Sequence, residues 1–179
     1  MNDSATVQRC LEGELDAFRM LVERYQGRAL GHAMAITRNR DDAQDAVQDA
    51  FVNAHRALHT FDRERVFYSW FYAILRNCCY KLVARRRPDI VDAPRELDLL
   101  ESPEVSLDDR LAIERALAAL APADREIVML RHLDGLSYSE LAASLQIPVG
   151  TVMSRLFNAR KRLRDGLTRG LPQDQIGER

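Results

Sequence analysis

The stretch Tyr138–Arg164, YSELAASLQIPVGTVMSRLFNARKRLR, decides the fold class of this sequence. It predicts a short helix behind a capping box formed by Ser137 and Glu140, then a tight turn, then a longer helix. Apolar residues stand at the offsets that hold two helices nearly perpendicular, and the small Ala142 stands where the helices touch. Gln146 occupies the turn position where Gly is common, so it must adopt a positive φ or use a variant turn. The pattern predicts a helix-turn-helix, with an ordinary three-helix bundle as the alternative.

The polar face of the longer helix suits contact with duplex DNA. In a helix-turn-helix, the second helix lies in the major groove with its N-terminal half against base edges. Ser, Arg and Asn side chains can read bases, while Lys and the later Arg residues suit phosphates. The residues predicted to face outward are Thr151, Met153, Ser154, Arg155, Asn158, Lys161 and Arg162.

The rest of the chain also follows a helical period. Apolar residues recur at three- and four-residue steps from Ala17 to Ile36 and again from Ala43 to Leu58. Residues 58–65 break this pattern and predict a loop, after which a helix rich in aromatic residues is expected from Val66 to Arg86. Because no strand or hairpin pattern competes, the predicted fold class is all-α.

Residues 88–105 separate two helical units. They contain three Pro residues and six acids against one Arg, and they show no helical or strand period. Behind them, Ser106 and Asp109 resemble a capping box, and Pro122 suits the first turn of a further helix. In a chain of 179 residues we therefore expect two small helical domains joined by an acidic flexible linker. The predicted ranges are a domain at 1–87, the linker at 88–105, a helix-turn-helix domain at 106–170 and a C-terminal tail at 171–179.

Each helical unit ends in a basic run, which the net charge of −1 conceals. Residues 76–87 contain five Arg or Lys and no acid, and residues 150–170 contain six against a single Asp. Two basic regions separated by an acidic strip favour two contacts with a polyanion. Solvated helix faces are the alternative interpretation.

The aromatic helix adds a way to hold unpaired bases. Phe67, Tyr68, Trp70, Phe71 and Tyr72 stand next to the first basic run, and a base stacked on an aromatic ring is worth about 1–3 kcal/mol. Several such contacts would offset the few kcal/mol that unstacking a base costs. We expect two or three of the five rings to lie in the core and the others to be open to nucleic acid.

Other classes of protein find little support in the sequence. The longest stretch without a charged residue, 141–154, is too short and too polar to span a membrane, and the N-terminus is unlike a signal peptide. His55 and His59 have the spacing of helical metal ligands, but the sequence offers no third ligand near them. We interpret Cys78 and Cys79 as small apolar residues of a helix, with a redox role as the alternative. We find no nucleophile motif or phosphate loop, and we expect a cytoplasmic protein that is not an enzyme and holds no metal or cofactor.

Three motifs resemble those of the sigma factors of bacterial RNA polymerase, in particular the small extracytoplasmic-function (ECF) type. Residues 41–51, DDAQDAVQDAF, are similar to the family's core-polymerase-binding stretch. Residues 61–72, FDRERVFYSWFY, continuing to Arg76 and Asn77, are similar to its −10 recognition and melting segment. Residues 149–156, VGTVMSRL, are similar to the start of its −35 recognition helix. The resemblance implies an alternative sigma factor that directs promoter recognition and is controlled by an anti-sigma factor.

The resemblance also implies partners for particular residues. The chain would bind promoter DNA, and on core RNA polymerase it would contact the β′ clamp helices and the β flap. Asp41, Asp45, Gln48 and Phe51 would dock on the clamp helices. The residues implied at the −10 element or along its backbone are Phe61, Asp62, Arg63, Glu64, Arg65, Phe67, Tyr68, Trp70, Arg76, Asn77, Arg85 and Arg86.

Two positions depart from the family pattern. Many members have Gly where Arg63 stands in the −10 loop, and several have a basic residue where Met153 stands in the −35 helix. An apolar residue at Met153 suits a thymine methyl rather than a guanine edge. A free-standing helix-turn-helix regulator, usually a dimer on a palindrome, is the alternative function, but it leaves the aromatic helix and residues 41–51 without a role.

Overall fold

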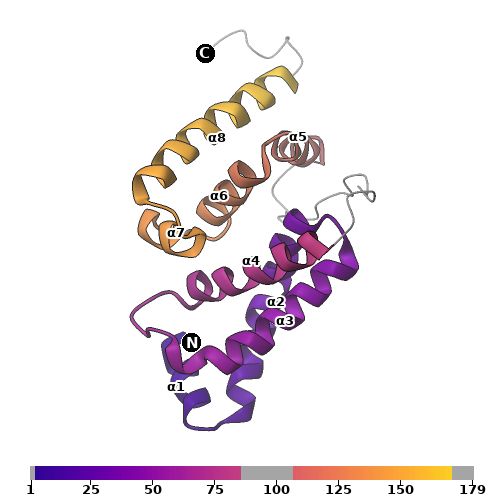
Figure 1. Ribbon diagram of the computed structural model, residues 1–179. Helices are drawn as coiled ribbons and strands as arrows, with labels where there is room; N and C mark the ends of the chain where they lie inside the picture. Colours follow the sequence, from indigo (N-terminus) through magenta and orange to yellow (C-terminus); the bar gives the residue numbers. More distant parts are fainter. Residues whose placement is uncertain (1–2, 86–106, 171–179) are drawn as a thin grey trace.

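The computed structural model describes residues 3–85 and 107–170, and the regular elements within these ranges are all helical (Figure 1). The all-α prediction is therefore confirmed, while the predicted linker, the C-terminal tail, Arg86 and the Ser106 cap lie outside the described residues. The first group of helices comprises α1 (Asp3–Leu11), α2 (Leu15–Thr37), α3 (Arg40–Ala57), the 3₁₀ turn η1 (Leu58–Thr60) and α4 (Phe67–Arg85). The second group comprises α5 (Leu107–Ala118), α6 (Pro122–His132), α7 (Tyr138–Leu145) and α8 (Val149–Gly170).

Helices α2, α3 and α4 pack on one another, and small residues allow their backbones to approach. Arg38 caps the C-terminus of α2 in the left-handed conformation, with a φ of 54°. Asn39 caps the N-terminus of α3, because its side chain accepts a hydrogen bond from the Asp42 amide at 3.0 Å and so satisfies one free donor of the first turn. The fully buried alanines of α2 and α3 are Ala17, Ala29, Ala33, Ala43, Ala46, Ala50 and Ala54.

The aromatic residues of α4 are more deeply buried than the sequence predicted. Phe67, Tyr68, Phe71 and Tyr72 have no exposed surface, and Trp70 is partly buried. The expectation of two or three core rings is wrong because α4 packs on α2 and α3 on one side and on α7 on the other (Figure 1). A helix covered on two sides can bury apolar residues nearly all round, whereas the sequence argument assumed a single buried face.

The second group of helices is built around the predicted helix-turn-helix. The capping box is confirmed, since Ser137 Oγ accepts from the Glu140 amide at 3.3 Å and the Glu140 carboxylate accepts from the Ser137 amide at 2.7 Å. Gln146 ends α7 with a φ of 55°, which is the first of the two predicted alternatives. Buried Arg125 of α6 donates to carbonyl oxygens at the end of α5, including Leu117 O at 2.8 Å, and ties these two helices together.

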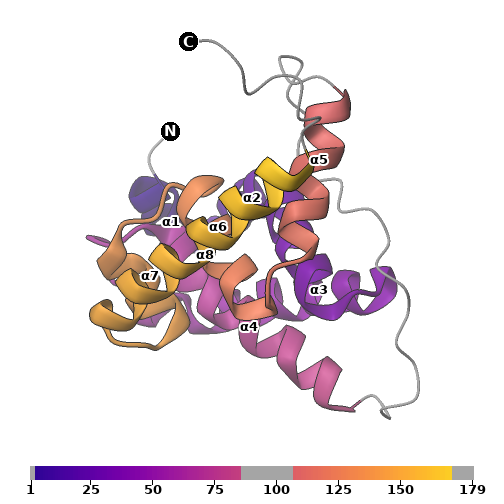
Figure 2. The same ribbon diagram turned by 90° about the horizontal axis from the view of Figure 1, so that it is seen from above.

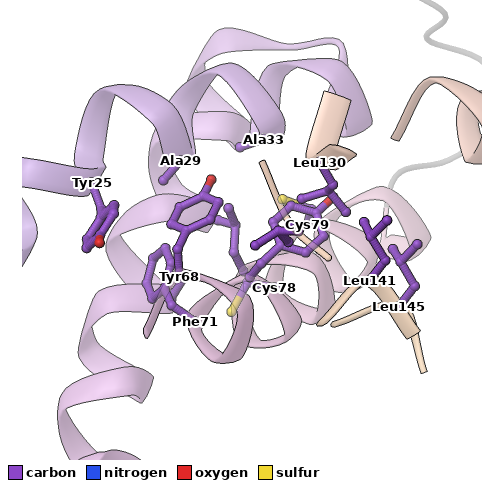
Figure 3. Packing of buried hydrophobic residues seen from close by; sticks show 14 of the residues in the cluster. Tyr25, Ala29, Ala33, Tyr68, Phe71, Cys78, Cys79, Leu130, Leu141 and Leu145 are labelled. Atoms are coloured by element: carbon purple, nitrogen blue, oxygen red, sulfur yellow. The ribbon is translucent and has the colours of Figure 1, made fainter. Parts of the chain in front are cut away.

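The two groups of helices also pack against each other, through α4 and α7 and through α2 and α6. Seen from above, the second group lies over α4 and α2 (Figure 2). One buried apolar cluster runs from Ala33 and Tyr68 in the first group to Leu130 and Leu141 in the second (Figure 3). Along the described ranges, no helix combines the length and the apolar composition that crossing a membrane requires.

Candidate nucleic-acid and partner interfaces

Helix α8 carries two large apolar side chains in solvent. Met153 and Phe157 lie one helical turn apart, and they are 53% and 70% exposed. Together with Tyr138 of α7, Ser154 and Asn158 they line a groove of about 770 Å³. Neighbouring exposed apolar residues on an otherwise basic helix mark a contact surface rather than a solvated face.

The predicted outward residues of α8 fall into three groups. Met153, Ser154, Asn158, Lys161 and Arg162 are exposed, whereas Thr151 and Arg155 are partly buried. Among the exposed ones, Arg162 is already engaged, because its Nη1 lies 2.5 Å from Asp124 Oδ2 at the start of α6. Sequence reasoning missed Phe157, although its position four residues after Met153 is the signal that places it on the same side of the helix.

A second groove, of about 600 Å³, lies between α2 and α3 in the first group. Of the four residues predicted to bind core polymerase, Gln48 and Phe51 line this groove, and Phe51 is almost fully buried. Asp41 and Asp45 are exposed on α3 outside the lining. The lining residues are Val22, Gln26, Gly27, Leu30, Gln44, Val47, Gln48, Phe51 and Val52, an apolar floor with amides at its edge.

The predicted −10 loop is anchored at Phe61 and at Arg63. Phe61 is buried, with its ring centroid 5.3 Å from that of Trp70. Asp62, Arg63, Glu64 and Arg65 are exposed in the turn that follows. α1 holds this turn, because Ser4 Oγ donates to the Arg63 carbonyl at 2.5 Å and the Arg63 guanidinium donates to Gln8.

The remaining −10 residues differ in their accessibility. Asn77 and Arg85 are exposed on α4, but Arg76 is partly covered and its Nε donates to Glu126 Oε1 of α6 at 2.8 Å. Phe67 and Tyr68 are fully buried, so neither ring can stack on a base in this arrangement of the helices. Arg86 lies outside the described residues.

The cysteines and histidines form no chemical centre in the part of the chain that the structure describes. Cys10, Cys78 and Cys79 are free thiols, and burial raises the pKa of Cys79 to about 12, which leaves it as an unreactive thiol. His55 packs edge-on against Phe18, and His59 faces the Arg56 carbonyl. No group of His, Cys, Asp and Glu side chains in the described ranges is placed to hold a metal ion.

Comparison with protein families agrees with this arrangement of surfaces. Residues 21–88 match the model for sigma-70 region 2, and residues 110–163 match that for sigma-70 region 4. The RNA polymerase sigma-H factor of Pseudomonas aeruginosa is 37% identical over 174 residues, covering 89% of this chain and 90% of that protein. The ECF RNA polymerase sigma-E factor of Escherichia coli K12 is 36% identical over 180 residues, covering 90% of this chain and 92% of that protein.

The chain therefore belongs to the sigma-70 family of RNA polymerase sigma factors. Within that family it is a sigma factor of the ECF type, a class that binds core RNA polymerase and promoter DNA.

Solved structures show the same fold in this class. The sigma factor RpoE of Bartonella quintana, in complex with the anti-sigma factor NepR, aligns with a TM-score of 0.71 at 26% identity over 86% of this chain and 98% of that one. CnrH, in complex with the cytosolic domain of CnrY, aligns with a TM-score of 0.68 at 29% identity over 94% of this chain and 99% of that one. Both neighbours combine the two helical groups in one chain.

Proposed function

We propose that this chain binds core RNA polymerase and directs it to promoters by two separate DNA contacts. Residues 1–87 would bind polymerase and the −10 element, and residues 106–170 would read the −35 element. One observation carries the proposal: a single chain presents both the α2–α3 groove and the exposed surface of α8. The proposal assigns no catalysis to the chain, and the proposed site of action is the cytoplasm, where polymerase and chromosome meet.

The α2–α3 groove is the proposed polymerase contact. Its apolar floor, including Leu30 and the partly exposed Val52, suits an amphipathic helix laid into a groove. Amides at Gln26, Gln44 and Gln48 supply hydrogen-bond partners at the rim. The β′ clamp helices are the proposed occupant, with exposed Asp41 and Asp45 contacting basic residues beside the groove.

The exposed surface of α8 is the proposed −35 contact. Met153 and Phe157 would pack on thymine methyl groups, and Asn158 would donate to and accept from an adenine edge. Lys161 suits the phosphate backbone, as does Arg162 once its ion pair with Asp124 opens. We therefore expect the −35 element of this chain to be rich in A·T pairs opposite the N-terminal half of α8.

The turn after Phe61 is the proposed −10 contact. Exposed Asp62 and Arg65 frame a turn that α1 holds in place, and Trp70 stands behind it. A turn fixed in this way can receive an extruded base without losing its own entropy on binding. The exposed Asn77 and Arg85 of α4 would follow the neighbouring backbone.

Control by an anti-sigma factor is part of the proposal. RpoE of Bartonella quintana was solved with the anti-sigma factor NepR. CnrH was solved with the cytosolic domain of CnrY. An inhibitor that covers the α2–α3 groove would block recruitment by polymerase directly.

A free-standing regulator that uses only α7 and α8 is the competing function. It would bind DNA as a dimer and protect two equivalent half-sites. To separate the two, the chain is mixed with core polymerase, passed over a sizing column, and the eluted complex is footprinted on promoter DNA. Co-elution with an asymmetric footprint of two unlike boxes supports the proposal, whereas a symmetric footprint by the chain alone favours the regulator.

A further inference from the structure

Helix α1 lies outside both regions that match the sigma-70 models, which cover residues 21–88 and 110–163. It is nevertheless attached firmly to the first group of helices. Val7 is fully buried, and Asp3 accepts a hydrogen bond from the Tyr25 hydroxyl of α2. α1 is therefore a fixed part of the fold, and whatever it holds is positioned relative to α2.

Two polar contacts join α1 to residues 62–65, which we call the −10 turn. Both contacts are made with Arg63: Ser4 Oγ donates to its carbonyl at 2.5 Å, and its guanidinium donates to Gln8 Oε1. Ser4 and Gln8 are four residues apart, so they lie on the same side of α1. One helix therefore holds both the backbone and the side chain of a single turn residue.

The side-chain amide of Gln8 is oriented for this contact. Gln8 Nε2 donates to Glu12 Oε1 at 2.6 Å. A carboxylate accepts hydrogen bonds and donates none, so Glu12 takes the NH₂ end of the amide. The oxygen end is left to face the Arg63 guanidinium, and the orientation that receives it is set at the end of α1 itself.

The −10 turn is closed by its own backbone without an unusual conformation at Arg63. The amides of Glu64 and Arg65 donate to the Asp62 carboxylate at 3.1 Å and to the Asp62 carbonyl at 3.0 Å. Within the described ranges, the positive φ values of non-glycine residues fall elsewhere. Because the backbone does not require Gly at this position, a long side chain can stand there and anchor the turn to α1.

A second path leads from α1 to the start of the −10 turn. The ring of Tyr25, whose hydroxyl donates to Asp3, stacks on Phe67 with centroids 5.6 Å apart. Phe67 in turn meets the edge of Phe61, also at 5.6 Å. Since Phe61 directly precedes the turn, α1 is connected to the turn through both Phe61 and Arg63.

From these contacts we infer that α1 is a positioning element for base recognition at the −10 element, with Ser4 and Gln8 as positioning residues. In this arrangement Arg63 is an anchor of the turn and not a base contact. The inference rests on the proposed function for its consequence, whereas the hold on Arg63 is measured on the free chain. The exposed side chains left to meet an extruded base are those of Asp62, Glu64 and Arg65.

Trypsin cleavage after Arg63 measures whether α1 holds the turn. The protease must take the Arg63 guanidinium into its specificity pocket and the Arg63 carbonyl into its oxyanion hole. These are the two groups that Gln8 and Ser4 engage. In Ser4→Ala/Gln8→Ala, we expect this bond to be cut about tenfold faster or more than in the wild type, as followed by mass spectrometry. Equal rates in the two proteins overturn the inference.

Arg9→Ala is the matched control on the same helix. It removes an ion pair with Glu14 at 2.7 Å that does not involve the −10 turn. We expect Arg9→Ala, and also Ser4→Thr, which keeps the hydroxyl, to be cut after Arg63 at the wild-type rate. If Arg9→Ala is cut as fast as the double variant, the stability of α1 and not its contacts with Arg63 controls the turn, and the inference fails.

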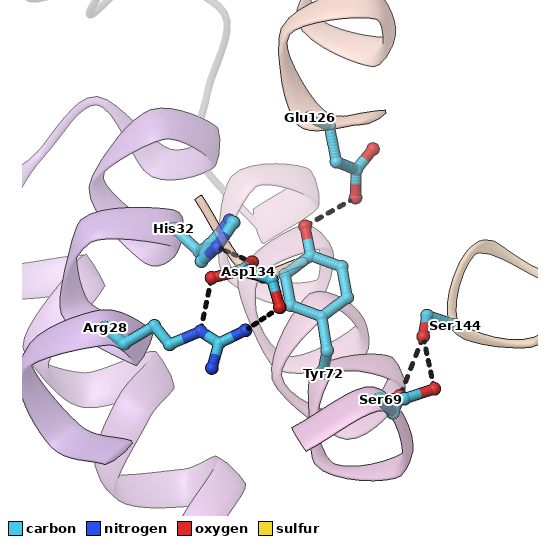
Figure 4. Close-up of polar contacts among 7 residues, drawn as sticks. All are labelled: Arg28, His32, Ser69, Tyr72, Glu126, Asp134 and Ser144. Carbon is cyan, nitrogen blue, oxygen red and sulfur yellow. Dashed lines mark hydrogen bonds and ion pairs between the residues drawn. The ribbon is translucent and has the colours of Figure 1, made fainter. Parts of the chain in front are cut away.

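The double variant leaves the polar contacts between the two groups of helices untouched. These contacts include those of Asp134, in the turn after α6, with Arg28 and His32 of α2 (Figure 4). Neither changed residue of α1 takes part in them. A change in the rate of cleavage after Arg63 is therefore assigned to the contacts of α1 with the turn.

Base discrimination at the −10 element tests the consequence for function. Transcription with core polymerase is measured over promoters that carry each base at each −10 position behind one constant −35 element, and over a matching −35 series. We expect Ser4→Ala/Gln8→Ala to lose discrimination about fivefold or more at a −10 position, because an unheld turn adapts to more than one base. Its discrimination among −35 variants should equal that of the wild type.

The outcomes separate positioning from a general structural defect. A structural defect lowers transcription from all promoters alike, so unchanged discrimination refutes the inference and leaves the proposed function standing. A wild-type chain that directs no promoter-dependent transcription refutes the proposed function instead, while the trypsin result still decides whether α1 holds the turn.

Arg63→Ala distinguishes an anchor from a base contact. If Arg63 acts only through Ser4 and Gln8, adding Arg63→Ala to the double variant causes no further loss of −10 discrimination, since the three residues form one coupled unit. A further loss of about fivefold or more would assign Arg63 to the base and contradict the inference.

Discussion

Helices α4 and α8 are both predicted to contact promoter DNA, yet they present their side chains in opposite ways. α8 displays Met153, Phe157 and Asn158 to solvent. α4 buries four aromatic rings and has Arg76 covered by α6. On the proposed function, α8 offers its DNA-facing side chains to solvent, whereas most rings of α4 serve the core and Arg76 is held by Glu126 of α6.

The largest expected effect is a difference in the free energy of unfolding that is lost when an aromatic residue is removed from α4 or from α8. Phe71 of α4 has no exposed surface and stacks on Phe51 with ring centroids 4.5 Å apart. Phe71→Ala should lower the free energy of unfolding by about 3–5 kcal/mol, because it removes a core ring and leaves a cavity. The exposed Phe157→Ala should change it by less than about 0.5 kcal/mol. Urea unfolding of both variants measures this, and equal losses would break the contrast between the helices.

A smaller effect sharpens the reading of α8 itself. Arg155→Ala should cost about 1–3 kcal/mol of DNA binding at one base position, since Arg155 lies in the N-terminal half of α8, the half proposed to read bases. Lys161→Ala should instead weaken all sequences alike and reduce the slope of log affinity against log salt by about 1. Binding to a set of −35 variants at two or more salt concentrations distinguishes them. A uniform loss for Arg155→Ala would assign that residue to phosphate.

The next effect tests the α2–α3 groove, which α4 does not line. Val52→Asp places a charge in the α2–α3 groove and should weaken binding of core polymerase about tenfold, or roughly 1.4 kcal/mol. Leu11→Asp on α1 is the matched control, because both side chains are 44% exposed and Leu11 lies outside the groove lining. Titration of labelled core polymerase gives both affinities. If the two variants bind equally well, the groove is not the polymerase contact.

The smallest effect concerns the helix that precedes α8. α7 has only eight residues, so it depends on its capping box more than the long α4 depends on its ends. Ser137→Ala should cost about 1 kcal/mol of stability. Thermal unfolding followed by circular dichroism checks this, with Ser139→Ala, a neighbouring serine of the first turn, as the control. A larger loss for Ser139→Ala would contradict the role assigned to the cap.

Local features were predictable from the sequence, and contacts between distant segments were not. The Ser137–Glu140 box and the exposure of Met153 follow from short-range rules of capping and helical period, and the positive φ of Gln146 is one of the two alternatives that these rules left open. The pairing of Asp134 with Arg28 had no such signal, because a charge in a turn reads as solvated until its partner is known. The deep burial of the α4 rings was missed because no short-range pattern indicates that α7 packs on the side of α4 opposite α2 and α3.

The most direct test of the account is transcription in vitro with purified core polymerase and this chain over a library of promoters. The account predicts new start sites that depend on the chain and share two unlike boxes, with mutations opposite Met153 and Asn158 affecting only the upstream box. Failure of the chain to bind core polymerase, or binding that yields no promoter-dependent transcript, would contradict it.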